Sequence, residues 1–117
     1  MQKYCDIKVD PKYFNLIQEK KKTVEGRIYR DKYAQLYAGD IIRFTTEFQE
    51  LYARVLSTKR FDSFAAMLAY YGIKNCLSDV ETLNEAVKIY YSFPNYQNQE
   101  QQFGVVGIEI EVCDINL

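Results

Sequence analysis

Strand-like segments fill the first half of this chain and return at its end, and that order limits the folds available to it. Residues 23–28 alternate polar and apolar side chains around Gly26, which is typical of a strand with one buried face. Four more segments rich in β-forming residues lie at 4–9, 41–46, 51–59 and 104–113. Residues 47–49 predict a hairpin loop between two of these segments.

Helical spacing of apolar residues appears between the strands. Asp10-Pro11 is a typical helix start, and an apolar stripe follows it. A second helix is expected across residues 62–71, ended by a glycine. Residues 78–81 have the pattern of a capping box, which predicts a third helix after them. We expect residues 96–102, which are polar and rich in glutamine, to form a loop.

The order of these elements predicts the fold class. Strands that pair over short distances, with helices set apart from them, favour an α+β fold with a mixed or barrel-like sheet. A doubly wound parallel sheet is disfavoured because strands and helices do not alternate regularly. The length of 117 residues suits one domain, so we expect residues 1–117 to form a single domain.

Histidine is absent from the sequence. This removes the commonest general base and the commonest zinc ligand, and we expect neither a metal nor a cofactor. The three cysteines are odd in number and lack zinc-binding spacing, which predicts buried free thiols. The N-terminus has no apolar signal-peptide core, and no apolar run approaches the roughly 20 residues that span a bilayer. We therefore expect an intracellular protein without membrane association.

Positive charge is concentrated in the first half of the chain. Of the fifteen lysines and arginines, only Lys74 and Lys88 lie beyond residue 60, although the formal net charge is −1. A basic face for a phosphate backbone is one interpretation. The other is that the two halves interleave in space and their charges cancel.

The basic segment ends in a strand with an isolated acid. Lys20, Lys21 and Lys22 form a predicted turn, and Glu25 and Arg27 follow on one face of the next strand. The two side chains form either a structural ion pair, which contributes little at a surface, or part of a site. In a site, Glu25 would accept a hydrogen bond from a base or ribose while Arg27 meets a phosphate.

Five sequence pieces in order resemble a known family. They are Lys21 to Arg27, Gly39 to Phe44, Phe61 to Phe64, Tyr90-Tyr91 and Gly104 to Ile110. Together they resemble the small stand-alone ASCH-domain proteins of the PUA-like superfamily, over nearly the whole chain. The resemblance implies a compact mixed β-barrel with flanking helices. It also implies RNA binding in a cleft lined by the lysine-rich turn, the strand after it and the Gly-Asp turn.

A few members of that family are enzymes. One branch removes an acyl group from a modified cytidine with a lysine, a threonine and a glutamate, and another member is described as a ribonuclease. Lys22 matches the lysine of the deacylase pattern. Glu25 stands where the threonine is expected, and the position of the acid falls near Asn75. Two of the three positions therefore differ in this chain.

Tyrosines supply candidates for base stacking. Tyr90 lies on an apolar helical stripe and is assigned to the core, so Tyr91 is the better cleft candidate, with Tyr29 as the alternative for stacking a base. Asp40 either stabilises the turn before a strand or forms part of the cleft. The expected nucleic-acid-binding residues are Lys21, Lys22, Thr23, Glu25, Arg27, Asp40 and Tyr91.

Three functional hypotheses follow. The first is an RNA-binding domain that recognises a short single strand or one nucleotide, modified or not. The second is a metal-independent hydrolase acting on RNA or a modified nucleoside, of the ribonuclease or nucleoside amidohydrolase type, with Lys22 and Glu25 as the catalytic pair. The third is a protein-interaction adaptor, although no motif in the sequence names a protein partner.

Overall fold

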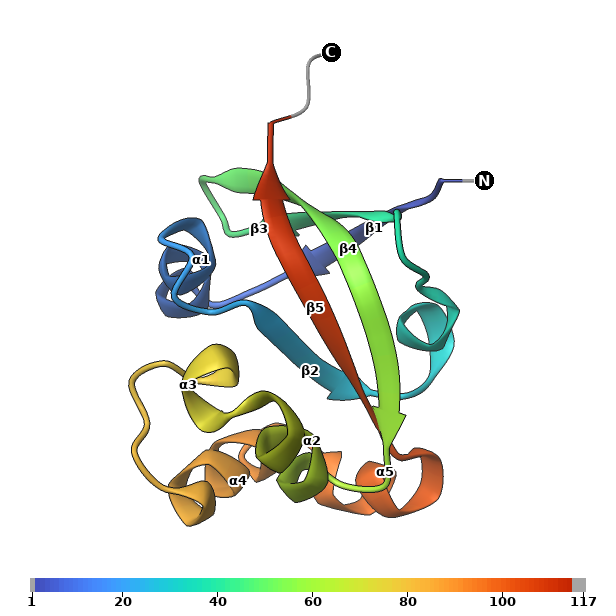
Figure 1. The fold of residues 1–117 in the computed structure, drawn as a ribbon, viewed down its shortest axis with the longest axis vertical. Helices are drawn as coiled ribbons and strands as arrows, with labels where there is room; N and C mark the ends of the chain where they lie inside the picture. Colours follow the sequence, from blue (N-terminus) through green and yellow to red (C-terminus); the bar gives the residue numbers. More distant parts are fainter. Residues whose placement is uncertain (1, 115–117) are drawn as a thin grey trace.

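A computed structural model describes residues 2–114, and its centre is one five-stranded mixed sheet (Figure 1). The strand order is β1-β3-β4-β5-β2, with β1 and β3 parallel and every other neighbouring pair antiparallel. The strands are β1 (Tyr4–Lys8), β2 (Val24–Ile28), β3 (Ile41–Thr45), β4 (Glu50–Phe61) and β5 (Val105–Cys113). All five expected strands are present, and the predicted hairpin joins β3 to β4.

The sheet curls into a half-barrel, and this confirms the predicted α+β class with a barrel-like mixed sheet. The long strands β4 and β5 twist across the whole molecule (Figure 1), and a register shift between Val55 and Ser57 marks a bulge in β4. Such a bulge bends the strand and increases its twist. In residues 2–114 the sheet is open, with β1 at one edge and β2 at the other.

Five α-helices and one 3-10 helix flank the sheet in the described residues. They are α1 (Pro11–Gln18), η1 (Asp31–Gln35), α2 (Phe64–Tyr71), α3 (Ile73–Cys76), α4 (Leu83–Tyr91) and α5 (Tyr96–Phe103). Asp10 caps α1 by accepting the Lys12 N–H at 2.9 Å, as predicted. Gly72 ends α2 with a φ of 91°, a conformation that glycine adopts without strain.

Two helix predictions were wrong. Residues 96–103 form helix α5 and not a loop, because tertiary contacts stabilise this polar segment: the buried Glu100 carboxylate accepts the Phe64 N–H at 2.7 Å. The capping box before α4 is formed by Thr82 and Glu85, since the Thr82 hydroxyl accepts the Glu85 N–H. Glu81, which the sequence placed in the box, pairs with Lys74 instead.

Two apolar clusters form the core. One fills the concave side of the half-barrel beneath α1, with Phe14, Ile42 and Phe44 fully buried. The other lies between β2 and the helices α2 to α4, around Phe64 and Met67. All three cysteines are free thiols, as predicted; Cys5 and Cys76 are buried and Cys113 is partly buried.

Candidate functional site

Strand β2 places Glu25 and Arg27 on one face, as the alternation predicted. Val24 and Ile28 point to the other face and join the second apolar cluster. The glycine between the two charged residues packs closely on the helices, since a Cβ at Gly26 would lie 2.7 Å from the Met67 methyl carbon. The helices therefore cover the Val24–Ile28 face of β2, while on the other face Glu25 is buried and Arg27 is partly exposed.

Lys22 and Arg27 both contact the Glu25 carboxylate. The Lys22 Nζ lies 3.5 Å from Oε1, and the Arg27 Nη2 lies 3.3 Å from Oε2. Lys22 also donates to the main-chain oxygens of Cys76 at 2.6 Å and Val24 at 3.0 Å. Two main-chain oxygens and one carboxylate oxygen therefore surround the ammonium group. Lys22 and Glu25 are only 3% and 6% exposed.

The Glu25 carboxyl group is kept ionised. Burial raises its pKa, but the charges of Arg27 and Lys22 outweigh burial and hold the pKa below its ordinary value. An ionised carboxylate only accepts hydrogen bonds. Glu25 can therefore meet N–H or O–H groups of a ligand but has no proton to give. The three side chains together carry one net positive charge.

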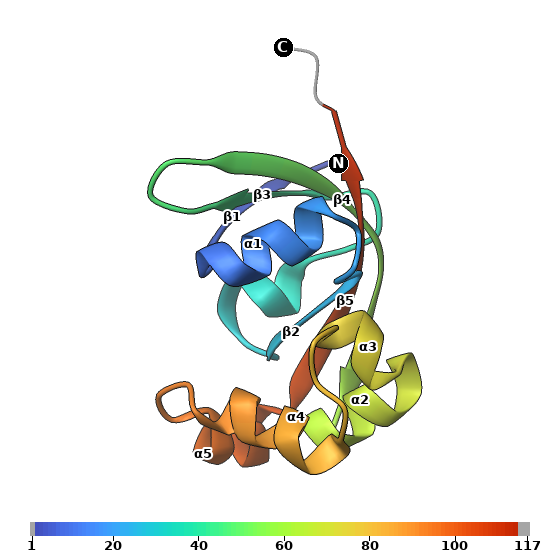
Figure 2. The same cartoon turned by 90° about the vertical axis from the view of Figure 1, so that its left-hand side faces the viewer.

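A pocket of about 250 Å³ opens beside this cluster. In Figure 2, α1 lies above β2 while α4 and α5 lie below it, and the pocket takes residues from all these elements. Its lining is Lys8, Val9, Asp10, Tyr13, Lys22, Glu25, Gly26, Arg27, Leu77, Tyr90, Phe93 and Tyr96. The volume is just below the roughly 300 Å³ at which pockets for drug-sized ligands begin. It suits one small flat molecule.

Aromatic side chains form the walls of the pocket. Tyr13, Tyr90, Phe93 and Tyr96 line it. Behind this lining, the fully buried Phe64 ring stacks on Tyr90 with centroids 4.3 Å apart and on Tyr96 with centroids 5.8 Å apart. On the α1 side, the Tyr13 ring centroid lies 5.7 Å from the Lys22 Nζ. The charged cluster therefore lies between aromatic groups of two separate helical regions. Rings arranged in this way favour flat aromatic ligands.

The Tyr90 hydroxyl is a buried polar group without a hydrogen-bond partner among the described residues. Tyr90 is 3% exposed and lines the pocket next to Gly26, where a Cβ would lie 3.2 Å from its oxygen. Burial, with smaller contributions from Cys76 and Glu25, raises the pKa of Tyr90 well above its usual value. The hydroxyl therefore keeps its proton. Buried hydroxyls are usually satisfied, so this one is available to a ligand.

Main-chain groups of β2 add to the pocket. The Ile110 N–H donates to the Thr23 oxygen, and the Tyr29 N–H donates to the Gly104 oxygen. In an antiparallel pair, alternate residues direct their peptide groups to the neighbour and the residues between direct theirs away from it. Gly26 falls in the second set, on the free edge of the sheet. Its N–H and C=O therefore face the pocket that it lines.

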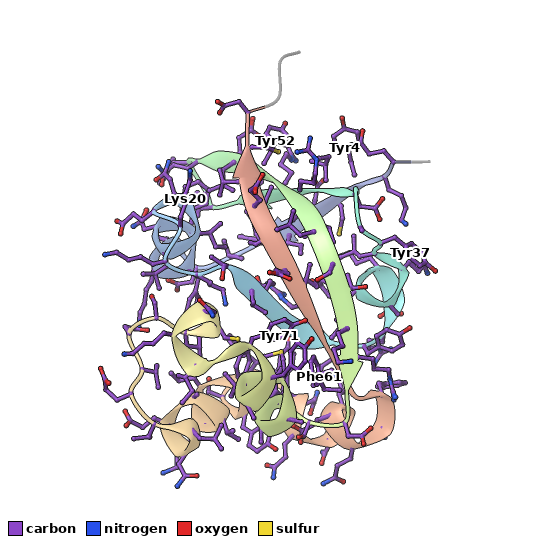
Figure 3. All side chains as sticks on the ribbon, viewed as in Figure 1. Tyr4, Lys20, Tyr37, Tyr52, Phe61 and Tyr71 are labelled. Carbon is purple, nitrogen blue, oxygen red and sulfur yellow. The ribbon has the colours of Figure 1, made fainter. Side chains whose placement is uncertain are left out.

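Lys21 and Thr23, two of the expected binding residues, lie outside this pocket. Lys21 is exposed and pairs with Glu19 at 3.2 Å. Thr23 lines a more open hollow with Lys20 and Asn75. Figure 3 shows Lys20 at the end of α1, on the side away from α4 and α5.

Asp40 also lies apart from the pocket. Its carboxylate accepts the main-chain N–H groups of Lys3 at 3.1 Å and Tyr37 at 2.8 Å, and it pairs with the Lys3 ammonium at 3.0 Å. Figure 3 shows Tyr37 on the edge of the molecule opposite α1. Asp40 therefore stabilises the turn before β3, and the structure does not bring it to Glu25.

Tyr91, unlike its neighbour Tyr90, has a hydrogen-bond partner in helix α5. Its hydroxyl donates to Glu100 Oε1 at 2.6 Å, and this bond raises the Tyr91 pKa to about 12. Tyr91 does not line the pocket, whereas Tyr90, assigned to the core from the sequence, is both buried and part of the pocket wall. Adjacent helical residues point in directions about 100° apart, so only one of the two can face the pocket.

Sequence reasoning did not find Lys8, Tyr13, Phe93 and Tyr96 as pocket residues. Tyr96 was missed because α5 was predicted to be a loop. Lys8 and Tyr13 come from elements read correctly, but nothing in their local pattern indicates that they approach β2. Their place in the site follows from the curl of the sheet.

Residues 2–114 contain no group of three or more histidine, cysteine or acidic side chains arranged to hold a metal ion. None of the helices in this part of the chain combines the length and hydropathy needed to cross a membrane.

The curled mixed sheet, its flanking helices and the pocket at the β2 edge define an α+β half-barrel protein of the PUA-like class. The family model for the ASCH domain matches residues 7–114. The chain belongs to the ASCH-domain family, a PUA-like family often linked to RNA binding.

Solved structures support this assignment. The chain is similar to the hypothetical protein PH0355, with 38% identity and a TM-score of 0.87 over 96% of this chain and all of that one. It is also similar to protein PF0455 from Pyrococcus furiosus, with 33% identity and a TM-score of 0.79 over 96% of this chain and 99% of that one. A comparison with curated proteins gave no match.

Proposed function

We propose that this protein binds single-stranded RNA, or a nucleotide, and holds one base in the pocket at the β2 edge. The observation that carries the proposal is the buried Lys22–Glu25–Arg27 cluster beneath aromatic walls. Single-stranded RNA is commonly recognised by stacking its bases on aromatic side chains and hydrogen-bonding their edges. A pocket of about 250 Å³ is of a size for one base and not for a duplex.

Phosphate contacts are assigned to Arg27 and Lys8. Arg27 keeps 20% of its side chain exposed at the pocket, and Lys8 is an exposed pocket residue on β1. Lys22 does not serve this purpose, since it already donates to two main-chain oxygens and pairs with Glu25. Its role in this proposal is to position the Glu25 carboxylate. Lys21 remains a candidate for a peripheral contact with a longer RNA.

The hydrolase hypothesis is supported less well by this geometry. It requires Lys22 and Glu25 to exchange protons with a substrate. Lys22 is fixed by two main-chain oxygens, and the lowered pKa of Glu25 makes it a weak base. These contacts favour a role for Lys22 and Glu25 in positioning a ligand and not in catalysis.

The experiment is a binding titration of a short fluorescent single-stranded RNA, read by anisotropy at several salt concentrations. We expect affinity to fall as salt rises, because phosphate contacts release counterions. Lys8→Ala and Arg27→Ala should each weaken binding several-fold and flatten the salt dependence. Arg54→Ala, which removes an exposed arginine outside the pocket, is the matched control.

Mass spectrometry of the same RNA after incubation separates binding from hydrolysis. An unchanged mass with salt-sensitive retention supports the binding function. A product that disappears with Lys22→Ala would support the hydrolase instead. Affinity that does not respond to salt or to the two pocket variants would overturn the proposal.

A further inference from the structure

We propose that the pocket prefers guanine among the four RNA bases, with Glu25 accepting two N–H groups of the base and the Tyr90 hydroxyl donating to its carbonyl oxygen. This inference rests on the proposed RNA-binding function and adds the identity of the base. The Glu25 carboxylate oxygens and the Tyr90 hydroxyl keep hydrogen-bonding capacity that a base can use.

Glu25 offers two acceptor positions side by side. Each carboxylate oxygen has one charged partner, Lys22 at Oε1 and Arg27 at Oε2. A carboxylate has about four lone-pair sites, so each oxygen can accept one more hydrogen bond. The matching ligand edge has two neighbouring N–H donors. Guanine presents such an edge, with N1–H beside the 2-amino group.

The other bases place an acceptor against one of these oxygens. Adenine and cytosine each have a single amino group beside a ring nitrogen that carries a lone pair. Uracil has one N–H between two carbonyl groups. In each case a lone pair of the base would face the Glu25 carboxylate in a buried site, where an unfavourable polar contact costs most.

Tyr90 supplies the third contact. Its hydroxyl lines the pocket without a partner among residues 2–114, and the raised pKa keeps its proton in place. Guanine carries its carbonyl oxygen next to N1–H, on the same edge that meets Glu25. Binding of guanine would therefore satisfy the buried hydroxyl. Adenine has an amino group at that position, and this group could not accept the Tyr90 proton.

The aromatic rings of the pocket suit a flat ligand. Tyr90 and Tyr96 line the pocket, and each stacks on the buried Phe64 ring behind them, with interplanar angles of 9° and 5°. Stacking itself tolerates every base. The preference must therefore come from the edge contacts, which can be tested one group at a time.

The test uses five pentanucleotides that differ only in the central base, with uridine at all other positions. The central bases are guanine, hypoxanthine, adenine, cytosine and uracil, and affinity is measured by calorimetry at one salt concentration. We expect the guanine oligomer to bind best. Hypoxanthine lacks only the 2-amino group and should bind about tenfold less tightly, since it loses one hydrogen bond to a charged acceptor.

Two conservative variants test the residues. Tyr90→Phe removes one hydroxyl and should weaken the guanine oligomer about tenfold while leaving the adenine oligomer unchanged. Tyr91→Phe is the matched control, because its hydroxyl bonds to Glu100 outside the pocket. Glu25→Gln should remove the preference for guanine over hypoxanthine, because an amide cannot accept at both positions.

The outcomes separate this inference from the proposed function. Equal binding of all five oligomers would overturn the guanine preference and leave RNA binding in place. Failure of every oligomer to bind would overturn both. A guanine preference that survives Tyr90→Phe would overturn the assignment of the hydroxyl.

Discussion

The Lys22 Nζ lies 3.5 Å from Glu25 Oε1, and both side chains are almost completely buried. Lys22 belongs to the turn after α1, and its ammonium group also donates a hydrogen bond to the Cys76 carbonyl at the end of α3. One ammonium group thus joins the turn, β2 and a helix 54 positions away in sequence. These contacts fix the position of the Glu25 carboxylate, which lines the pocket.

Removal of the Lys22 charge should destabilise the fold. Lys22→Met leaves the main-chain oxygens of Val24 and Cys76 without their donor and leaves Glu25 with one charged partner. We expect the free energy of unfolding to fall by about 3–5 kcal/mol, the usual range for breaking one side of a buried pair. Urea denaturation measures this change.

Lys21→Met provides the control for that measurement. Lys21 has 63% of its side chain exposed and pairs with Glu19 at the surface, so its loss should change stability by about 0.5 kcal/mol or less. Equal effects of the two substitutions would show that the Lys22 contacts contribute no more than a surface pair.

Stability should depend on pH through Glu25. Its pKa in the folded state lies below the ordinary value of 4.5, so below that value the unfolded chain binds more protons than the folded one. The stabilisation is therefore present above pH 4.5 and is lost as pH falls through the folded pKa. Urea unfolding measured from pH 6 down to about pH 3 should show this decline.

Asp40 and Asp79 have lowered pKa values as well, because hydrogen bonds and paired charges outweigh burial. The decline in stability should thus be shallower in Glu25→Gln but not absent. A slope identical to that of the unmodified protein would contradict the assignment of an ionised, charge-paired Glu25.

Adjacent tyrosines should respond oppositely to loss of the hydroxyl. Tyr90→Phe removes a buried hydroxyl that has no hydrogen-bond partner within residues 2–114, so the free energy of unfolding should stay the same or rise by up to about 1 kcal/mol. Tyr91→Phe removes the 2.6 Å hydrogen bond to Glu100 and should lower the free energy of unfolding by about 1–2 kcal/mol. Thermal and urea unfolding distinguish these results, and a destabilised Tyr90→Phe would mean that the hydroxyl is already satisfied.

Glu100 should be the residue on which helix α5 depends. Its two carboxylate oxygens accept the Phe64 N–H at 2.7 Å and the Tyr91 hydroxyl at 2.6 Å, and the residue is 7% exposed. Glu100→Ala should lower the free energy of unfolding by about 2–3 kcal/mol, because both donors become unsatisfied. Gln101→Ala, at an exposed position of the same helix, should have almost no effect on unfolding.

Sequence patterns were sufficient for the sheet and for the centre of the site. Local alternation identified β2 and placed Glu25 and Arg27 on one face. Both the strand pattern and the shared face depend only on residues that are close in sequence. The order of strands and helices then predicted the α+β class. These features required no knowledge of long-range packing.

The remaining site features depend on contacts between distant segments. Helix α5 was missed because its polar residues carry little helical signal and Glu100 anchors it through tertiary bonds. Tyr90 was assigned correctly to a buried face, but the place of its hydroxyl beside Gly26 becomes visible only once β2 and α4 are packed together. The Gly39-Asp40 sequence pattern is the same whether Asp40 belongs to a binding site or only stabilises a turn.

The central claim is that RNA places a base in the pocket at the β2 edge, and NMR titration with a short single-stranded RNA tests it most directly. We expect the largest amide shift changes at Gly26, Arg27, Leu77 and Tyr96, all of which line the pocket. Changes concentrated instead at Lys20, Thr23 and Asn75 would place the ligand in the open hollow on the other side of β2. That result, or a spectrum unaffected by RNA, would contradict the account.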